Sequence, residues 1–345
     1  MDSESGEEAS TLRAVDRPLG IVLLLALPAS GKSEIRRYLA SLPPHVARSD
    51  FNLGPTIQID DYPYVHLMRR ISQEQVRLGS APAFFADDTQ PFLDDRDWGT
   101  LTVLLDEDYQ ALKRETRECI DDPARRLLDR LDRARAAAGA PAPFDDLDSR
   151  AALEAAIAKD AAEVVAALPS GPLEEGETVV MEFARGGPRG SVMPLPPPFG
   201  YRYALSMLSP EILSRAAILY VWVSPEESRR KNRERARPGA DGSILHHGVP
   251  EAVMEAEYGV DDMAWLLESS DIPGTVTVNA HGRVFHLPAA RFDNRVDRTS
   301  FLRADPGRWP PNEIRAVHEE LQRAFRSLQE SREALDESGD VGGDR

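Results

Sequence analysis

The sequence has almost no cysteine, very little lysine and no long hydrophobic run. Cys119 is the only cysteine among 345 residues, which excludes an internal disulfide framework and a zinc site built on cysteine thiolates. No apolar stretch approaches the length that a membrane-spanning helix needs. The first residues are acidic and polar, unlike a secretory signal, so we expect a cytoplasmic protein without a membrane partner.

Acidic residues outnumber basic ones, 58 to 41. The formal net charge is −17 and the isoelectric point is about 4.9, which argues against nucleic acid as a bulk partner because phosphate backbones need a basic surface. Lysine occurs only at positions 32, 113, 159 and 231, and arginine supplies the other cations. A lysine inside a motif is therefore a strong signal in this chain.

The most specific motif covers residues 26–33, with the sequence Ala-Leu-Pro-Ala-Ser-Gly-Lys-Ser. It fits the phosphate-binding loop, and the apolar run 21–25 before it and the helical pattern 34–40 after it provide the strand and the helix that this loop requires. A glycine-containing turn that matches by chance is the alternative. We expect the loop to bind a nucleoside triphosphate through Pro28, Ala29, Ser30, Gly31, Lys32 and Ser33.

Within the loop, two side chains have separate expected roles. Lys32 reaches the β- and γ-phosphates, and the Ser33 hydroxyl binds Mg²⁺.

Apolar strand-like runs alternate with helical patterns along the rest of the chain. This alternation predicts an α/β fold, a three-layer sandwich with a mainly parallel five-stranded sheet. The expected strands are 21–25, 56–59, 178–183, 217–223 and 275–278, the last leading through 279–282 into 283–287 as a terminal hairpin.

The gap between the second and third strands is far longer than one crossover needs. We expect one α/β domain over 17–330 with a helical insertion at 62–170, containing helices from Pro123 to about Ala138 and from about Ser149 to Leu168. Composition predicts disordered tails at 1–16 and 331–345.

Carboxylates follow or interrupt two of these strands. Asp60 and Asp61 end the second strand, where ligands of parallel sheets bind; either is a candidate general base, and Asp60 is also a candidate contact of the substrate. A solvated turn or a helix cap is the alternative. Glu182 lies inside an apolar strand, where it either holds the metal environment or forms a buried salt bridge, with Arg185 as a candidate partner.

Arginines form two further candidate groups. Arg185, beside a Gly-Gly-Pro loop, suits an anionic substrate, although a plain surface loop explains it equally well. A helix capped by Ser224 carries Arg229, Arg233 and Arg237 at spacings of four, and Pro238–Gly242 follows as a hinge. We expect a lid over 225–270 whose Arg229 and Arg233 stabilise the transferred phosphoryl group; a solvated helix with internal ion pairs is the alternative.

Together these parts resemble the P-loop kinases of small molecules, which include nucleoside and nucleotide kinases, adenylylsulfate kinase and zeta-toxin-like kinases. The likeness rests on residues 27–33, on Asp60 and Asp61, and on the arginine-bearing helix after Ser224. The resemblance implies a sheet of order 2-3-1-4-5, ATP and Mg²⁺ as cofactors, and an acceptor site between the second and third strands.

The expected activity is phosphoryl transfer from ATP to a small hydroxyl- or phosphate-bearing acceptor. A nucleotide-binding regulator with slow hydrolysis is one alternative, although the Asn-Lys-x-Asp signature of guanine-specific proteins is absent. A polynucleotide 5′-kinase is another, and the acidity of the chain argues against it. The acceptor, the choice between ATP and GTP and the oligomeric state stay open at this stage.

Overall fold

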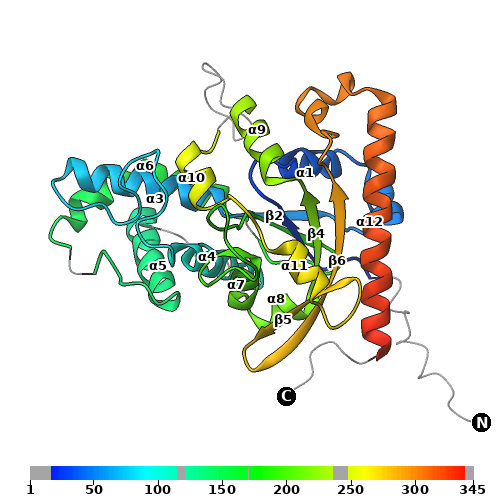
Figure 1. The fold of residues 1–345 in the computed structure, drawn as a ribbon. Coiled ribbons are helices and arrows are strands. Elements are labelled where there is room, and N and C mark those ends of the chain that lie inside the picture. The colour runs from blue at the N-terminus through cyan, green and yellow to red at the C-terminus, as the bar shows by residue number, and fades with distance from the viewer. Residues whose placement is uncertain (1–16, 115–120, 146, 170, 236–247, 339–345) are drawn as a thin grey trace, which may run out of the picture.

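The computed structural model of the protein describes residues 17–114, 121–145, 147–169, 171–235 and 248–338. A six-stranded sheet forms the centre of an α/β fold, with helices around it (Figure 1). The strands are β1 (Ile21–Leu25), β2 (Thr56–Asp60), β3 (Thr178–Phe183), β4 (Ala216–Trp222), β5 (Thr275–Ala280) and β6 (Arg283–Asp293). Their spatial order is β2-β3-β1-β4-β6-β5, and every neighbouring pair is parallel except β5 with β6.

Strand β1 shows why the sheet needs helices on both faces. All five of its side chains are apolar and buried, and successive side chains of a strand point to opposite faces. Ile21, Leu23 and Leu25 belong to one hydrophobic core, whereas Val22 and Leu24 belong to another. The strand is therefore covered on both sides, as its uninterrupted apolar run predicts.

Two sets of helices supply these cores. One face is covered by α1 (Lys32–Ala40), α2 (Pro44–Phe51) and α12 (Pro311–Ser338), and the other by α4 (Asp97–Leu112), α7 (Gly200–Met207), α8 (Pro210–Arg215) and α11 (Met263–Glu268). In Figure 1 the long helix α12 runs along the right side of the sheet. The result is three layers, helix, sheet and helix, around two apolar interfaces.

The long segment between β2 and β3 forms a helical extension on the left of Figure 1. Its helices α3 (Tyr62–Arg77), α5 (Pro123–Ala137) and α6 (Arg150–Ala167) enclose a core of their own. Helix α4 contributes Trp98 and Leu101 to that core and Leu105 and Tyr109 to the core of the sheet, so it joins the two parts. The Asp122 side chain caps α5 by accepting a hydrogen bond from the Arg125 N–H at 3.1 Å, as the sequence predicted.

The sheet differs from the prediction in strand number and in order. We expected five strands in the order 2-3-1-4-5, with the hairpin strand as an accessory. In the structure that second hairpin strand, β6, extends to Asp293 and lies next to β4, while β5 forms the edge. Pro288 hid this extension in the sequence, because proline interrupts most strands; here it faces Thr275 of the edge strand.

The remaining elements are short and lie in the last third of the chain. They are α9 (Pro225–Arg235), α10 (Glu251–Ala256) and two 3₁₀ turns at Ser300–Arg303 and Pro306–Arg308. Helix α12 continues to Ser338, beyond residue 331, where we expected a disordered tail to begin. The expected tail at 1–16, Arg237 and the hinge at 238–242 lie outside the described residues.

Candidate functional site

The loop that joins β1 to α1 has two residues in the left-handed region of backbone conformation. Ala29 has a φ of 56° and Gly31 a φ of 105°. A Cβ atom on Gly31 would lie 2.4 Å from Oγ1 of Thr299 and 2.7 Å from Nδ2 of Asn294. Position 31 therefore requires glycine for two reasons, its backbone conformation and the close approach of another loop.

The start of α1 presents unused hydrogen-bond donors. Among the described residues, the backbone N–H groups of Gly31, Lys32, Ser33 and Glu34 have no acceptor, and Ile35 is the first to donate, to the Gly31 carbonyl at 3.0 Å. Such N–H groups, together with the helix dipole, make a favourable environment for an anion. The buried Ser30 hydroxyl also lacks a partner.

Lys32 lies folded over this loop. Its ammonium donates to the Ala26 carbonyl at 2.9 Å and to the Leu27 carbonyl at 3.5 Å, and the side chain is buried. Burial lowers the pKa of Lys32, although nearby carboxylates, Glu182 first, oppose the shift. A cation is therefore held beside the loop, near the carboxylates at the carboxyl ends of β2 and β3.

Strands β2 and β3 bring the predicted carboxylates together. Asp60 and Glu182 occupy matching positions in the parallel pair. Glu182 Oε1 accepts a hydrogen bond from the Ser33 hydroxyl at 3.4 Å. The Arg36 guanidinium lies 3.2 Å from Asp60 Oδ2 and 3.1 Å from Glu182 Oε2, so one arginine neutralises two acids. The sequence analysis missed Arg36, although its place one helical turn after Lys32 could have suggested it.

Asp61 and Arg185 form a separate buried pair. The Arg185 side chain is 1% exposed; its Nη1 lies 2.5 Å from Asp61 Oδ2, and its Nη2 donates to Thr102 Oγ1 at 3.2 Å. Its guanidinium also packs 5.1 Å from the Trp98 ring centre. Arg185 therefore pairs with Asp61 in this structure and does not face the cavity of a substrate. The salt bridge that we considered for Glu182 is formed with Arg36, not with Arg185.

Burial changes the acidity of the carboxylates. It raises the pKa of Glu182 to about 7, with the nearby Asp60 adding to the shift and Arg36 opposing it. Burial also raises the pKa of Asp61, while the Arg185 charge opposes the increase. A carboxyl with a pKa near 7 changes its charge in the working range of most enzymes.

A cavity of about 450 Å³ adjoins these groups. Ser33, Arg36 and Asp60 line it, together with Gln58 of the edge strand and the residues that end α6. Asp61, in contrast, is 8% exposed and turned to Arg185. Of the two neighbouring aspartates, Asp60 is therefore the one that a ligand in this cavity could contact.

Helix α9 packs against the loop at 26–33. Ser224 caps it by accepting a hydrogen bond from the Glu227 N–H at 3.1 Å, as expected. The Ser228 hydroxyl donates to the Pro28 carbonyl at 2.7 Å, and Arg235 lies 2.7 Å from Glu34 of α1. The helix that we expected to carry lid arginines thus contacts the loop directly.

The two arginines predicted on α9 have different surroundings. Arg229 is 6% exposed and lies 3.2 Å from Glu226 and 3.6 Å from Glu255, with its Nη1 buried and unpaired. Arg233 is 59% exposed and lies 3.4 Å from Glu251. Arg229 is therefore partly available for a further anion, whereas Arg233 resembles an ordinary surface ion pair.

The second half of the expected lid is attached to the loop after β3. Gly187 and Val260 form an antiparallel bridge through two backbone hydrogen bonds of 2.9 and 3.2 Å. The Arg189 N–H donates to the Glu255 carbonyl at 2.9 Å. Residues 255–260 of the expected lid are therefore fixed to the loop after β3 by backbone pairing.

A layer of side chains that supports the loop at 26–33 was not foreseen. Asn294, after β6, donates to the Ser30 carbonyl at 2.7 Å and to Thr299 at 2.9 Å. Lys231 of α9 donates to the Asn294 carbonyl at 3.3 Å. Nothing in the local sequence at 294–299 marks this role, because it arises only when β6 occupies the position next to β4.

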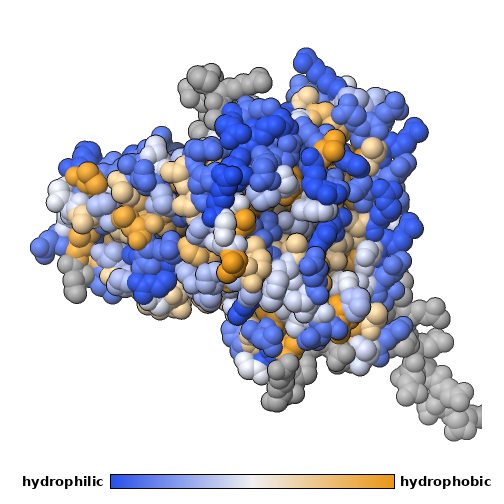
Figure 2. All heavy atoms as spheres, viewed as in Figure 1, coloured by the Kyte–Doolittle hydropathy of each residue, from blue (hydrophilic) through white to orange (hydrophobic). Residues whose placement is uncertain are grey.

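Comparisons with models of known protein families and with curated protein sequences find no match for this chain. Among the described residues, no three histidine, cysteine or acidic side chains are grouped so that they could hold a metal ion by themselves. No helix in the described part of the chain has both the length and the apolarity to cross a membrane. On the face shown in Figure 2, hydrophobic residues lie in small separate groups among hydrophilic ones.

Proposed function

We propose that the protein is an ATP- and Mg²⁺-dependent phosphotransferase that acts on a small hydroxyl- or phosphate-bearing acceptor. The observation that carries this proposal is the loop at 26–33, whose motif, glycine geometry and four unused N–H donors coincide with a buried lysine. These features suit a triphosphate group, and the carboxylates at the ends of β2 and β3 suit its transfer.

The residues around Ser33 fit a magnesium ion. Magnesium is usually held by one or two protein oxygens, with phosphates and waters completing its shell, so a cluster of three acids is not required. The Ser33 hydroxyl and Glu182, which lie 3.4 Å apart, would hold the ion. The bound ion would supply positive charge next to the β- and γ-phosphates.

Asp60 is the proposed general base. It lines the cavity beside Ser33, whereas Asp61 is paired with a buried arginine. One oxygen of Asp60 accepts the Tyr62 N–H at 2.8 Å, and the other faces Arg36, which fixes the direction of the carboxylate. From there it would accept the proton of an acceptor hydroxyl as the oxygen attacks the γ-phosphate.

Cationic side chains complete the proposed machinery. Lys32 would leave the Ala26 carbonyl and bind the β- and γ-phosphates. Arg229, with its buried unpaired Nη1, would stabilise the charge that develops during transfer if α9 moves toward the phosphates. Arg233 would contribute less, because it is largely exposed and already paired.

The decisive experiment measures ADP release with ATP and Mg²⁺ in the presence and absence of a library of small hydroxyl compounds and phosphate esters. We expect turnover to be slow until an acceptor is added, and Lys32→Ala to lower it at least about a hundredfold, since it removes a cation from the transferred phosphates.

Lys159→Ala is the matched control. Lys159 is 89% exposed on α6 and lies 3.7 Å from Glu163, away from the loop. Its loss should leave turnover unchanged. A folded Lys32→Ala protein with full turnover would contradict the phosphate-loop assignment. Lysine-dependent hydrolysis that no acceptor accelerates would instead favour a regulatory nucleotide-binding protein.

A further inference from the structure

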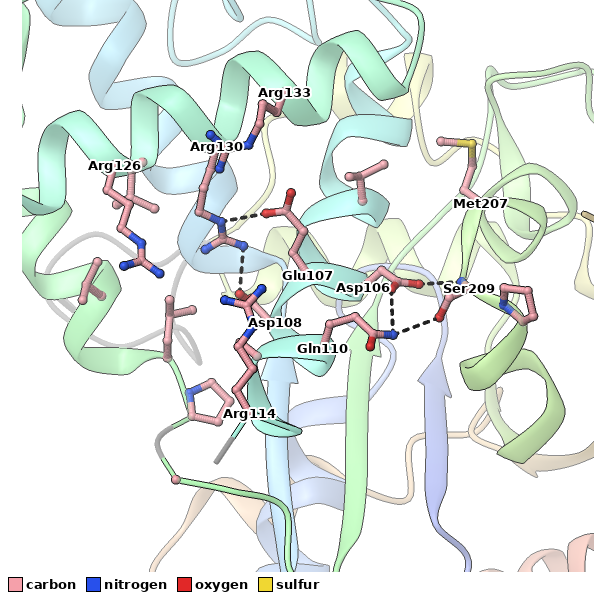
Figure 3. A pocket seen from close by; sticks show the side chains of 18 of the residues that line it. Asp106, Glu107, Asp108, Gln110, Arg114, Arg126, Arg130, Arg133, Met207 and Ser209 are labelled. Carbon is pink, nitrogen blue, oxygen red and sulfur yellow. Dashed lines mark hydrogen bonds and ion pairs between the residues drawn. The ribbon is translucent and has the colours of Figure 1, made fainter. Parts of the chain in front are cut away.

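A second and larger cavity, of about 670 Å³, adjoins the cavity beside Ser33 (Figure 3). Its walls come from α4, α5, the end of α6 and the start of α8. Asp108, Leu168 and Pro169 line both cavities, so the two spaces meet at the end of α6. A ligand that binds beside Asp60 in the smaller cavity therefore has the larger one next to it.

The carboxylates that line the larger cavity are engaged by other protein groups. Arg130 lies 2.8 Å from Glu107 and 2.9 Å from Asp108, and Figure 3 marks both contacts. Asp106 accepts a hydrogen bond from the Ser209 N–H at the start of α8. Because each acid already has a partner, a ligand in this cavity does not meet an unpaired negative charge.

The other polar groups of the lining are also engaged, or are exposed to solvent. Arg114 and Arg126 each have an interaction partner. The Gln110 amide lies 3.4 Å from two neighbouring side-chain oxygens, and the His281 ring lies 2.8 Å from a backbone carbonyl oxygen. Arg133 is exposed. The cavity therefore offers a ligand little polar surface that is without a partner in the protein.

Apolar side chains supply the rest of the walls. They come from α4, α5, the end of α6 and the end of α7, and include Val103, Leu127, Val165, Leu168, Pro169 and Met207. Sites for small organic ligands are typically apolar pockets in which a few polar groups fix the orientation of the ligand. Here the smaller cavity holds such polar groups, among them Ser33 and Asp60, and the larger cavity holds the apolar walls.

We propose that the acceptor is an alcohol with an apolar body, whose hydroxyl lies beside Asp60 and whose body extends past Leu168 and Pro169 into the larger cavity. The alcohol oxygen forms a bond to the γ-phosphorus while its proton passes to Asp60. The bond from that phosphorus to the oxygen bridging the β-phosphate breaks, and ADP leaves. This inference rests on the proposed function, because it assigns the acceptor of that reaction.

The test uses three neutral probes that carry a hydroxyl on different bodies: n-octanol, the shorter n-butanol, and triethylene glycol, whose long chain is interrupted by ether oxygens. Isothermal titration and saturation-transfer NMR on the full chain, without nucleotide, measure their affinities. Two buried methylene groups change an affinity by about a factor of ten. We therefore expect octanol to bind at least roughly tenfold more tightly than butanol and than triethylene glycol.

Variants locate the binding site. Ala111→Trp, at an exposed position of α4 that lines the larger cavity, fills part of the space and should weaken octanol at least roughly tenfold. Ala152→Trp makes the same change at an exposed position of α6 that lines neither cavity, and should change nothing. Met207→Gln makes the wall polar and should weaken octanol but not triethylene glycol. Melting temperatures confirm that the variants are folded.

ADP release then separates this inference from the proposed function. With ATP and Mg²⁺, octanol should accelerate ADP release more than triethylene glycol does, and Ala111→Trp should raise the KM for octanol. Lys32-dependent release that triethylene glycol accelerates and octanol does not would overturn the inference and leave the phosphotransferase standing. Equal affinities of the three probes, octanol binding unchanged in Ala111→Trp, or bound octanol that does not accelerate release would overturn it too. Full release in Lys32→Ala would instead contradict the proposed function, whatever the affinity for octanol.

Discussion

Two clusters of buried charge in this protein are built in opposite ways. In the inserted helices, the Tyr64 hydroxyl contacts both oxygens of Asp108 at 2.8 and 2.7 Å, and Arg130 binds Tyr64, Asp108 and Glu107. Around the loop at 26–33, two carboxylates share the single Arg36, the first N–H groups of α1 have no described acceptor, and the Ser30 hydroxyl is unpaired.

The contrast separates a structural network from the proposed binding site. Buried polar groups that all have partners fix a fold, and removing one partner costs stability. Buried groups without partners also cost stability, so their persistence calls for a ligand that completes them. We therefore expect substitutions in the first cluster to affect folding and substitutions around the loop to affect turnover.

The largest effect in this comparison should come from Asp60→Asn. The variant keeps the size of the side chain but cannot accept a proton, so the maximal rate should fall about a hundredfold or more while ATP affinity changes little. Steady-state kinetics with a saturating acceptor and isothermal titration of ATP measure the two quantities.

Asp61→Asn is the matched control for this prediction. It removes the carboxylate that pairs with the buried Arg185, and an unpaired buried charge destabilises a protein by roughly 3–5 kcal/mol. Its main effect should therefore appear in urea unfolding. If Asp61→Asn were the variant that keeps stability and loses turnover, the roles of the two aspartates would be reversed.

A smaller effect is expected from Glu182→Gln. This variant should raise the stability of the fold, whereas Asp61→Asn should lower it. Burial raises the pKa of Glu182 from 4.5 to about 7, so the folded state holds a proton that the unfolded state releases between these values. Stability therefore falls as the pH rises from about 4.5 to 7. The amide avoids this penalty, and at pH 8 it should stabilise the fold by on the order of 2 kcal/mol, with no gain at pH 4.

Glu257→Gln is the control that separates the gain in stability from a role of Glu182 in turnover. Burial also raises the pKa of Glu257 to about 7, and this side chain accepts the Phe92 N–H at 2.9 Å, outside the loop at 26–33. Both variants should gain stability at pH 8, measured by thermal unfolding, but only Glu182→Gln should lose Mg²⁺-dependent turnover. A loss of turnover in both would remove the distinction between the two acids.

The smallest effect should come from Tyr64→Phe. It deletes the hydroxyl between Asp108 and Arg130 but leaves their direct contact of 2.9 Å. We expect a loss of about 1–2 kcal/mol in urea unfolding with unchanged kinetics. Tyr203→Phe removes a hydroxyl that has no hydrogen-bond partner among the described residues and should be close to neutral. Lower turnover in a stable Tyr64→Phe protein would mean that the first cluster also serves the site.

The parts of the fold that local sequence determines were predicted closely. Strand β3 has the predicted bounds Thr178–Phe183, and helices α5 and α6 lie where the Asp122-Pro123 and Pro169 signals placed them. These signals are short-range, because a run of buried apolar residues or a proline next to a cap acts within a few positions. The place of β6 depends on a partner strand more than sixty residues earlier, and no local pattern specifies it.

The candidate site was likewise predicted only in those parts that local sequence determines. The loop motif and the pairing of β2 with β3 follow from local signals. They bring Ser33, Asp60 and Glu182 together at the carboxyl ends of the strands. Which aspartate turns to Arg185 and which to the cavity depends on the direction of each side chain at the end of the strand. That choice is made by packing against Trp98 and Thr102 of the insertion, which the sequence could not show.

The contact between Asn294 and the proposed phosphate loop has a consequence for synthesis of the chain. Asn294 donates to the Ser30 carbonyl across 264 positions, and Thr299 lies against Gly31. The loop itself leaves the ribosome early, but its supporting side chains follow only after β6. A nascent chain that ends before residue 294 therefore holds an unsupported loop, and nucleotide binding should begin abruptly, late in translation, rather than grow with chain length.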